Sequence, residues 1–315
     1  MAIYAAKRAL QLIPVLFIVS LIVFFIVHLI PGDPVAVILG EDAQDPKVYE
    51  ALRKELGLDR PIHVQYLNWL GRVLQGDLGQ SPRSHRPVLD IVIERYPPTI
   101  YLACGSLLLG ILIAIPAGTL AAVKQNTAYD YGAMLFALFG VSVPNFFFAI
   151  LLILGLGVYL GWLPTIGYVP PGTDFLRFLQ HLTLPAIVLG TDVASSTTRF
   201  VRAEMLDQLR LDYVRTARAK GLPPRVVLYK HALRNSLIAA TTVIGLFAGR
   251  LLGGSTVVET VFAWPGLARL VLEAVYARDY PVLQGAVLFL AVSYVFVNLI
   301  VDLLYQWLNP RIRLA

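Results

Sequence analysis

The chain has 315 residues, of which 57% are hydrophobic and only 15% are charged, and its formal net charge is +6. A soluble domain carries about a quarter charged residues, so these polar residues are too few to cover a water-exposed surface. In so apolar a chain, an excess of Lys and Arg more often reflects orientation in the bilayer and contact with anionic lipid than nucleic-acid binding. The composition therefore predicts an all-α integral membrane protein.

Long uncharged apolar runs predict six transmembrane helices. Each run reaches the roughly 20 residues that a helix needs to cross the hydrocarbon core. The first run is longer than the apolar part of a signal peptide, and "PGDP" follows it instead of a small-residue cleavage site, which predicts a retained helix. The six predicted spans cover residues 9–30, 98–123, 133–160, 182–203, 236–258 and 283–307.

The positions of Lys and Arg predict the orientation. The stretch 199–235 holds nine basic and three acidic residues, whereas the loops 161–181 and 259–282 carry few basic residues. By the positive-inside rule, both termini are predicted to be cytoplasmic and residues 31–97 to face outward, since long loops translocate largely regardless of charge. The residues placed inside are Lys7, Arg8, Lys124, the stretch 199–235, Arg311 and Arg313.

The segment 31–97 predicts a small extracytoplasmic part between the first two spans. "DPKVYEALRKELGLD" has helical periodicity, with Pro46 near its start and Gly57 near its end, and "VQYLNWLGRVL" is a second amphipathic stretch. "QGDLGQSPRSHRP" is rich in turn residues. The predicted organisation is an N-terminal helix at 1–30, the outer segment at 31–97, and a membrane core of five spans at 98–315.

The chain carries no motif for catalysis or metal binding. It has no GxxxxGK[ST] phosphate loop, no HExxH, no paired cysteines and no histidine cluster. Ser255 lies among glycines in "LGGSTVV" but has no histidine nearby in the sequence, and small residues in a span usually serve helix packing. We therefore expect no catalytic residue, no metal site and no cofactor held by this chain.

Two charged residues lie inside predicted spans. Asp192 lies in "LPAIVLGTDVASSTTRF" and Arg250 in "VIGLFAGRLLGG". At about 1.5 Å of rise per residue, they lie roughly 15 Å and 12 Å below the outer surface. Because such charges face a protein interior or a wet cavity, our hypothesis is that they pair with each other or line a common polar path. An ion pair that only fixes two helices is the alternative.

The basic stretch at 204–235 has an unusual pattern. "DYVRTARAKGL" favours helix, Gly221 ends it, and Pro223 and Pro224 impose a turn. "RVVLYKHALRN" then resumes with apolar residues at helical spacing. The predicted helix, corner and second helix suit a knob presented to a cytosolic partner. A basic anchor on anionic lipid explains the charge but not the break.

At these residues the chain resembles the permease subunits of ATP-binding-cassette (ABC) importers, whose cytoplasmic signature is Glu-Ala-Ala, three residues, Gly. Aligning Gly221 with the signature glycine places Arg215-Thr216-Ala217 on the Glu-Ala-Ala positions. This form is similar to that of the dipeptide/oligopeptide branch, with "YxRTARAKGL" and then "HALRN". Stretches along the whole chain resemble that branch, including "VHLIPGDP", "GDLGQS", "ERYPPTIYLA", "LPAIVLG", "VVETVFAWPGLARL" and "VNLIVDLLYQWLNPRIR". Ala268 departs from a Pro-Gly-Leu-Gly motif, and no role for Asp192 or Arg250 follows from the resemblance.

The resemblance implies a type I ABC importer permease in the inner membrane of a prokaryote. It implies a heterodimer with a second, related permease, two cytoplasmic ATPase subunits that use ATP-Mg, and an extracytoplasmic solute-binding protein over the outer loops. ATP binding by the ATPases would move the coupling helix and switch the pore between inward-open and outward-open. The residues implied for the coupling helix are Tyr213, Thr216, Ala217, Lys220, Gly221 and Leu222.

The resemblance favours dipeptide or oligopeptide uptake. Importers of glutathione or of a nickel chelate share the same signatures, and the compact loop 161–181 resembles the shorter dipeptide or glutathione permeases. An ATP-independent channel or secondary carrier is a rival, but such a carrier should show internal repeats or a proton relay. A membrane-embedded enzyme is a third alternative, opposed by the missing catalytic residues.

Overall fold

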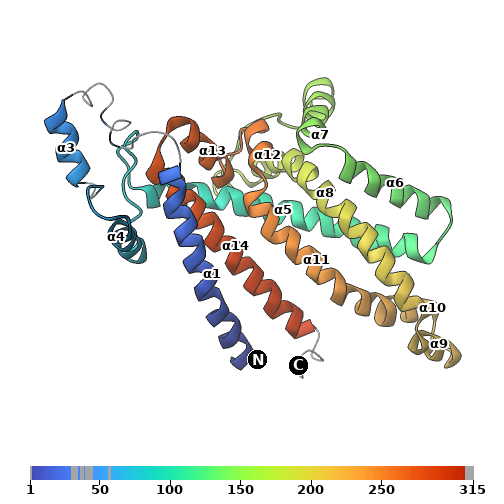
Figure 1. Cartoon of the computed structure of the whole chain (residues 1–315). Helices are drawn as coiled ribbons and strands as arrows, with labels where there is room; N and C mark the ends of the chain where they lie inside the picture. Colours follow the sequence, from blue (N-terminus) through green and yellow to red (C-terminus); the bar gives the residue numbers. More distant parts are fainter. Residues whose placement is uncertain (1, 30–34, 36–38, 40–44, 56–57, 309–315) are drawn as a thin grey trace. The chain divides into compact units, whose positions relative to one another are not determined.

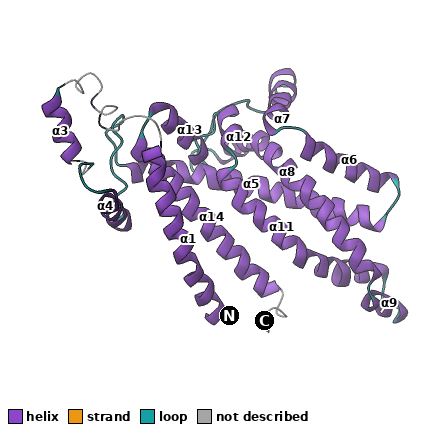
Figure 2. Ribbon diagram, viewed as in Figure 1, coloured by secondary structure: helices purple, strands orange, loops and turns teal. Residues whose placement is uncertain are grey.

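The computed structural model describes residues 2–29, 35, 39, 45–55 and 58–308. In these residues the secondary structure is helical, apart from one isolated antiparallel bridge between Gln80 and Pro87, as Figure 2 shows. Arg311 and Arg313 of the orientation argument, and the "PGDP" after the first span, lie outside the described residues. The all-α prediction is confirmed.

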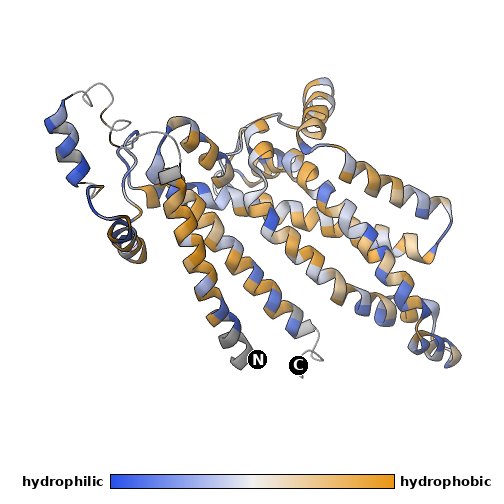
Figure 3. Ribbon diagram, viewed as in Figure 1, coloured by the Kyte–Doolittle hydropathy of each residue, from blue (hydrophilic) through white to orange (hydrophobic). Residues whose placement is uncertain are grey.

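In the described residues, apolar helices of membrane-spanning length are present at three of the six predicted spans, the second, the fifth and the sixth. Three described helices are long and apolar enough by themselves: α5 (Val88–Val123), the continuous helix Pro224–Gly253 that ends in α11 (Arg234–Gly253), and α14 (Tyr280–Leu308) over residues 280–304. The first helix, α1 (Ala2–Leu29), has its apolar stretch at Leu10–Ile26. Figure 3 shows this stretch in the colours of hydrophobic residues.

The third predicted span, 133–160, was expected to be one helix, and this is wrong. The chain instead forms α6 (Ala128–Ser142), then α7 (Asn145–Leu152) with the π-helix η2 (Ile153–Tyr159), bent by 106° at the break. Pro144 explains the break, because a residue before proline is driven out of helical geometry. Val143 accordingly has φ −84° and ψ 122°. The pair is one broken span or a re-entrant loop.

The fourth predicted span lies inside a longer helix, α8 (Phe175–Arg210). The Asp174 side chain caps its start by accepting a hydrogen bond from the backbone N–H of Arg177 at 3.0 Å. The helix packs against α6 and α11, as Figure 1 shows. Gly140 permits the close approach to α6, since a Cβ there would lie 1.9 Å from the Ser195 hydroxyl oxygen.

The chain forms two compact units. The first, residues 1–97 and 266–295, contains the predicted outer helices as α3 (Pro46–Glu55) and α4 (Ile62–Leu74), together with α13 (Leu267–Ala277). Its core holds Val88, Val92 and Leu283, all at most 4% exposed. In the same unit, α1 contacts α4 through a hydrogen bond between the hydroxyls of Ser20 and Tyr66, whose oxygens are 2.8 Å apart.

The second unit, residues 98–265 and 296–315, is built around the fully buried Trp264. Its indole N–H donates to the Pro98 carbonyl at 2.9 Å. Beside it, the short helix α12 (Thr256–Val261) buries Glu259, which accepts from the Ser255 hydroxyl at 2.8 Å. Tyr168 packs edge-on against Trp264, and its partial burial raises the pKa of the phenol, so this side chain stays neutral at ordinary pH.

Candidate functional site

The predicted coupling segment folds as a short helix followed by a sharp corner. Helix α9 (Asp212–Ala219) ends in a Schellman motif, in which the Gly221 N–H donates to the Arg218 carbonyl at 2.9 Å and the Leu222 N–H to the Ala217 carbonyl at 3.3 Å. Gly221 has φ +75°, which is the left-handed conformation that this motif requires. The chain re-enters helix at α10 (Pro224–Val226), with Pro223 extended. The sequence "GLPP" thus forms the corner that it predicts.

A small apolar core fixes α9 to the segment that follows it. Val214 and Ala217 are buried against Val227 of the π-helix η3 (Val227–Leu233), with Tyr213 packed beside them. The Tyr213 hydroxyl also donates to the Gln208 side chain of α8 at 2.7 Å. Because α9 contacts both α8 and η3, and η3 continues into α11, a force on α9 reaches two long helices.

The predicted contact residues do not all lie on the surface of α9. Thr216, Lys220, Gly221 and Leu222 are exposed. Ala217 instead faces the apolar core and is 7% exposed, and Tyr213 is partly buried. The accessible surface also includes two arginines outside the predicted set, Arg215 and Arg218.

The structure brings together the two charged residues that lie inside predicted spans. The Arg250 Nη2 donates to Asp192 Oδ2, joining the middle of α8 to the end of α11. The Arg250 side chain is 62% exposed in this chain, and that of Asp192 is 21% exposed. The guanidinium also lies 4.9 Å from the ring centroid of Phe247.

A second ion pair was missed by sequence reasoning. Arg202 of α8 donates from Nε and Nη2 to the two Asp130 carboxylate oxygens, at 2.5 and 2.8 Å. Asp130 lies in the first turn of α6 and also accepts from the Asn126 N–H at 3.0 Å. Its side chain is only 3% exposed. In the sequence, the only sign of this pair is Asp130 itself, an aspartate at the start of an apolar helix. The sequence does not show which basic residue it contacts.

Breaking this pair is expected to destabilise the protein. Asp130→Ala leaves the Arg202 charge without its partner and costs about 3 kcal/mol, the lower end of the range for buried pairs, because the Arg202 side chain is 23% exposed. The thermal melting of the purified complex checks this. Asp130→Ala with Arg202→Met should recover much of the loss, and an unchanged melting temperature in the single variant would contradict the role.

In the described part of the chain, no group of three or more His, Cys, Asp or Glu side chains is placed to hold a metal ion. The five histidines lie on separate segments. The candidate functional features are therefore the short helix α9 with its corner at Gly221 and the two interhelical ion pairs, Asp192–Arg250 and Asp130–Arg202.

Two family models together cover nearly the whole chain. Residues 114–314 match the binding-protein-dependent transport system inner membrane component, and residues 1–103 match the N-terminal part of such membrane components. Proteins of this family are transporter permease subunits, which are not themselves catalytic. The family therefore agrees with an importer subunit and disfavours the channel and membrane-enzyme alternatives.

The chain is also similar to curated relatives over its full length. It is 46% identical over 310 residues to the glutathione transport system permease protein GsiC of Escherichia coli O6:H1, covering 98% of each chain. GsiC of Escherichia coli K12 and of Shigella dysenteriae serotype 1 are each 45% identical with the same coverage. The resemblance to the peptide-type importer permeases is confirmed.

A solved structure shares the fold. The inward-facing MetNI methionine ABC transporter contains a chain that superposes with a TM-score of 0.56 at 18% sequence identity, covering 70% of this chain and 96% of that one. With its apolar helices, the chain is a multi-pass inner membrane protein. It belongs to the family of inner membrane components of binding-protein-dependent transport systems, the permease subunits of ABC importers.

Proposed function

We propose that this chain is the permease subunit of an importer of short peptides, with glutathione as the first candidate solute. The observation that carries the proposal is the 45–46% identity to glutathione permeases over 98% of both chains. Dipeptide and longer peptide uptake, which the sequence resemblance favoured, remains the second candidate. The nickel-chelate alternative gains no support from these relatives.

The proposed assembly follows from the family. Membership implies an ATPase and a solute-binding protein. We further propose that a second, related permease completes the pore, that two ATPase subunits dock on the cytoplasmic side and use ATP-Mg there, and that both termini are cytoplasmic. The nine basic residues of 199–235 support this orientation. The chain itself supplies no nucleotide-binding motif, so the energy must enter through its partners.

The proposed entry point for that energy is α9. Its exposed surface, with Thr216, Lys220, Gly221 and Leu222, would lie against an ATPase subunit. A buried face fixes the helix to η3, so a push by the closing ATPases would move α8 and α11 instead of bending a loop. The small residues Thr216 and Ala219 are exposed and support close approach of the ATPase, whereas Ala217 faces the apolar core.

Asp192 and Arg250 are proposed to line the translocation path. The support is their exposure: an ion pair that served only to fix α8 to α11 would be expected inside the contact between them, whereas the Arg250 side chain is 62% exposed. A guanidinium and a carboxylate side by side also suit a zwitterionic peptide, whose carboxylate and ammonium groups need opposite charges.

Reconstitution tests the function directly. This permease, the second permease, the ATPases and the binding protein are purified together and placed in proteoliposomes loaded with ATP-Mg. We expect uptake of glutathione that requires the binding protein and ATP. Alanyl-alanine and a nickel–histidine chelate serve as competing solutes. Uptake of the chelate but not of either peptide would contradict the proposal.

A further inference from the structure

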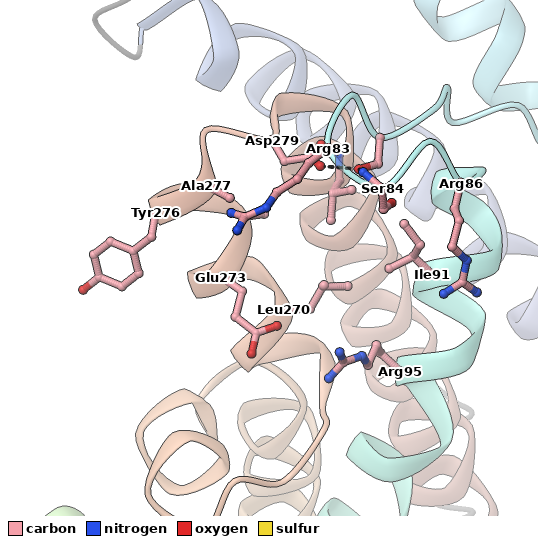
Figure 4. Close-up of a pocket in the computed structure, with 13 residues that line it drawn as sticks. Arg83, Ser84, Arg86, Ile91, Arg95, Leu270, Glu273, Tyr276, Ala277 and Asp279 are labelled. Atoms are coloured by element: carbon pink, nitrogen blue, oxygen red, sulfur yellow. Dashed lines mark hydrogen bonds between the residues drawn. The ribbon is translucent and has the colours of Figure 1, made fainter. Parts of the chain in front are cut away.

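A charged pocket lies within the first unit, and its lining includes no residue of α9 and neither Asp192 nor Arg250. Its volume is about 690 Å³, within the range of small-molecule sites. The turn-rich segment 81–86, the start of α5, α13 and the start of α14 form its walls, as Figure 4 shows. All of these lie on segments predicted to face outward.

Arginines dominate the polar lining of this pocket, and they differ in their partners. Arg86 pairs with Glu94 at 2.9 Å. The other two, Arg83 and Arg95, have no hydrogen-bond or ion-pair partner among the residues that the structure describes. Two guanidiniums that lack an anionic partner thus line the same pocket. They create a site for negatively charged groups, because a planar guanidinium binds a carboxylate through two parallel hydrogen bonds.

The same pocket also offers one acidic group and an apolar wall. Glu273 is held by Arg269 at 2.7 Å through Oε1, and its side chain is 41% exposed, so Oε2 remains accessible to a cation. Leu270 and Ile91 supply apolar contact, and Figure 4 shows them between the charged side chains. The second acid, Asp279, is instead buried and engaged by the Ser81 hydroxyl at 2.5 Å. That contact fixes the segment 81–86 to the start of α14.

We propose that this pocket binds the carboxylates of a small peptide through Arg83 and Arg95, with Glu273 facing the peptide ammonium group. The proposal rests on the proposed function and adds to it a binding site built from residues of the first unit alone. The volume of the pocket and the presence of both charge signs with an apolar wall favour a small zwitterionic ligand. An acidic side chain on the solute-binding protein is the competing source of a carboxylate.

The test uses the assembled complex of both permeases and both ATPases in lipid nanodiscs, without the binding protein. Binding of radiolabelled glutathione is measured by equilibrium dialysis, and glutathione diethyl ester, which lacks both free carboxylates, is the matched competitor. Arg83→Gln and Arg95→Gln should each weaken binding about tenfold, the loss expected for one charge-assisted hydrogen bond. The ester should not compete. Arg72→Gln, an exposed arginine of the same unit outside the pocket, should change nothing.

Two further measurements separate the alternatives. If a glutamine variant fails to assemble, Arg83→Lys or Arg95→Lys replaces it, since lysine keeps the positive charge. Each lysine variant should still weaken binding, because lysine cannot form the two parallel hydrogen bonds to a carboxylate. Binding of the solute-loaded binding protein is measured in parallel. Loss of that docking with unchanged glutathione affinity would assign the arginines to the partner protein and overturn the proposal.

The wild-type complex gives the remaining outcome. If it binds no glutathione without the binding protein, the pocket proposal is overturned. ATP-dependent uptake in the complete system would then still support the proposed function. Absence of uptake in the complete system, with glutathione bound at the pocket, would contradict the proposed function alone.

Discussion

Replacing Gly221 with aspartate is expected to abolish transport and the stimulation of ATPase activity by the loaded binding protein. The left-handed conformation at φ +75° costs a residue with a Cβ about 1–2 kcal/mol. Within this chain a Cβ at Gly221 would meet nothing within 4 Å, so the variant is expected to fold and to insert. The added side chain and charge would instead stand on the surface proposed to meet the ATPase.

Gly161 provides a matched control for this variant. It also has a positive φ of 62° and open space around the position of a Cβ, but it lies in the loop before α8. Gly161→Asp therefore carries the same backbone strain and the same charge without touching α9. Uptake into proteoliposomes and ATPase rates are compared in both. Normal transport by well-assembled Gly221→Asp, or an equal loss of ATPase activity in both variants measured without the binding protein, would argue strongly against α9 as the coupling helix.

Neutralising Arg250 is expected to reduce uptake about tenfold while the complex still assembles. In Arg250→Met the proposed path loses a carboxylate-binding group worth about one charge-assisted hydrogen bond. Asp192→Asn should give a loss of similar size, since the same pair would contact the ammonium group of the peptide. Uptake is measured against solute concentration, and assembly by co-purification of the ATPases.

The double variant separates the two roles of the pair. If Asp192 and Arg250 only fix α8 to α11, removing both charges with Asp192→Asn and Arg250→Met should restore much of the lost activity, because no charge is then left unpaired. If they contact the solute, the double variant should transport no better than either single one. Recovery to wild-type uptake would refute the pathway role.

The two ion pairs show where sequence reasoning reaches its limit. The depth argument placed Asp192 and Arg250 at similar levels, and the structure has them in contact although they are 58 positions apart. No such argument applied to Asp130 and Arg202, which are 72 positions apart and lie near helix ends, where charges are common. A single sequence holds no information on which helix ends meet.

The broken third span has a different cause. Pro144 is visible in the sequence, but apolar residues continue on both sides of it, and prolines are tolerated inside membrane helices. Pro185 lies within α8 without ending it. The same residue type therefore breaks one helix and not the other, since the surrounding packing decides whether the lost hydrogen bond is tolerated.

The sequence by itself determined the membrane class, the all-α architecture, the family and the corner at Gly221. These depend on composition, on runs of apolar residues and on the backbone freedom of glycine and proline, all of which are local. Only the tertiary structure decided which face of α9 is buried, which charges pair, and that segments around Ser81 and Asp279, 198 positions apart, form one arginine-lined pocket. The reason is physical: these features depend on contacts between distant segments, and those contacts exist only once the helices have packed.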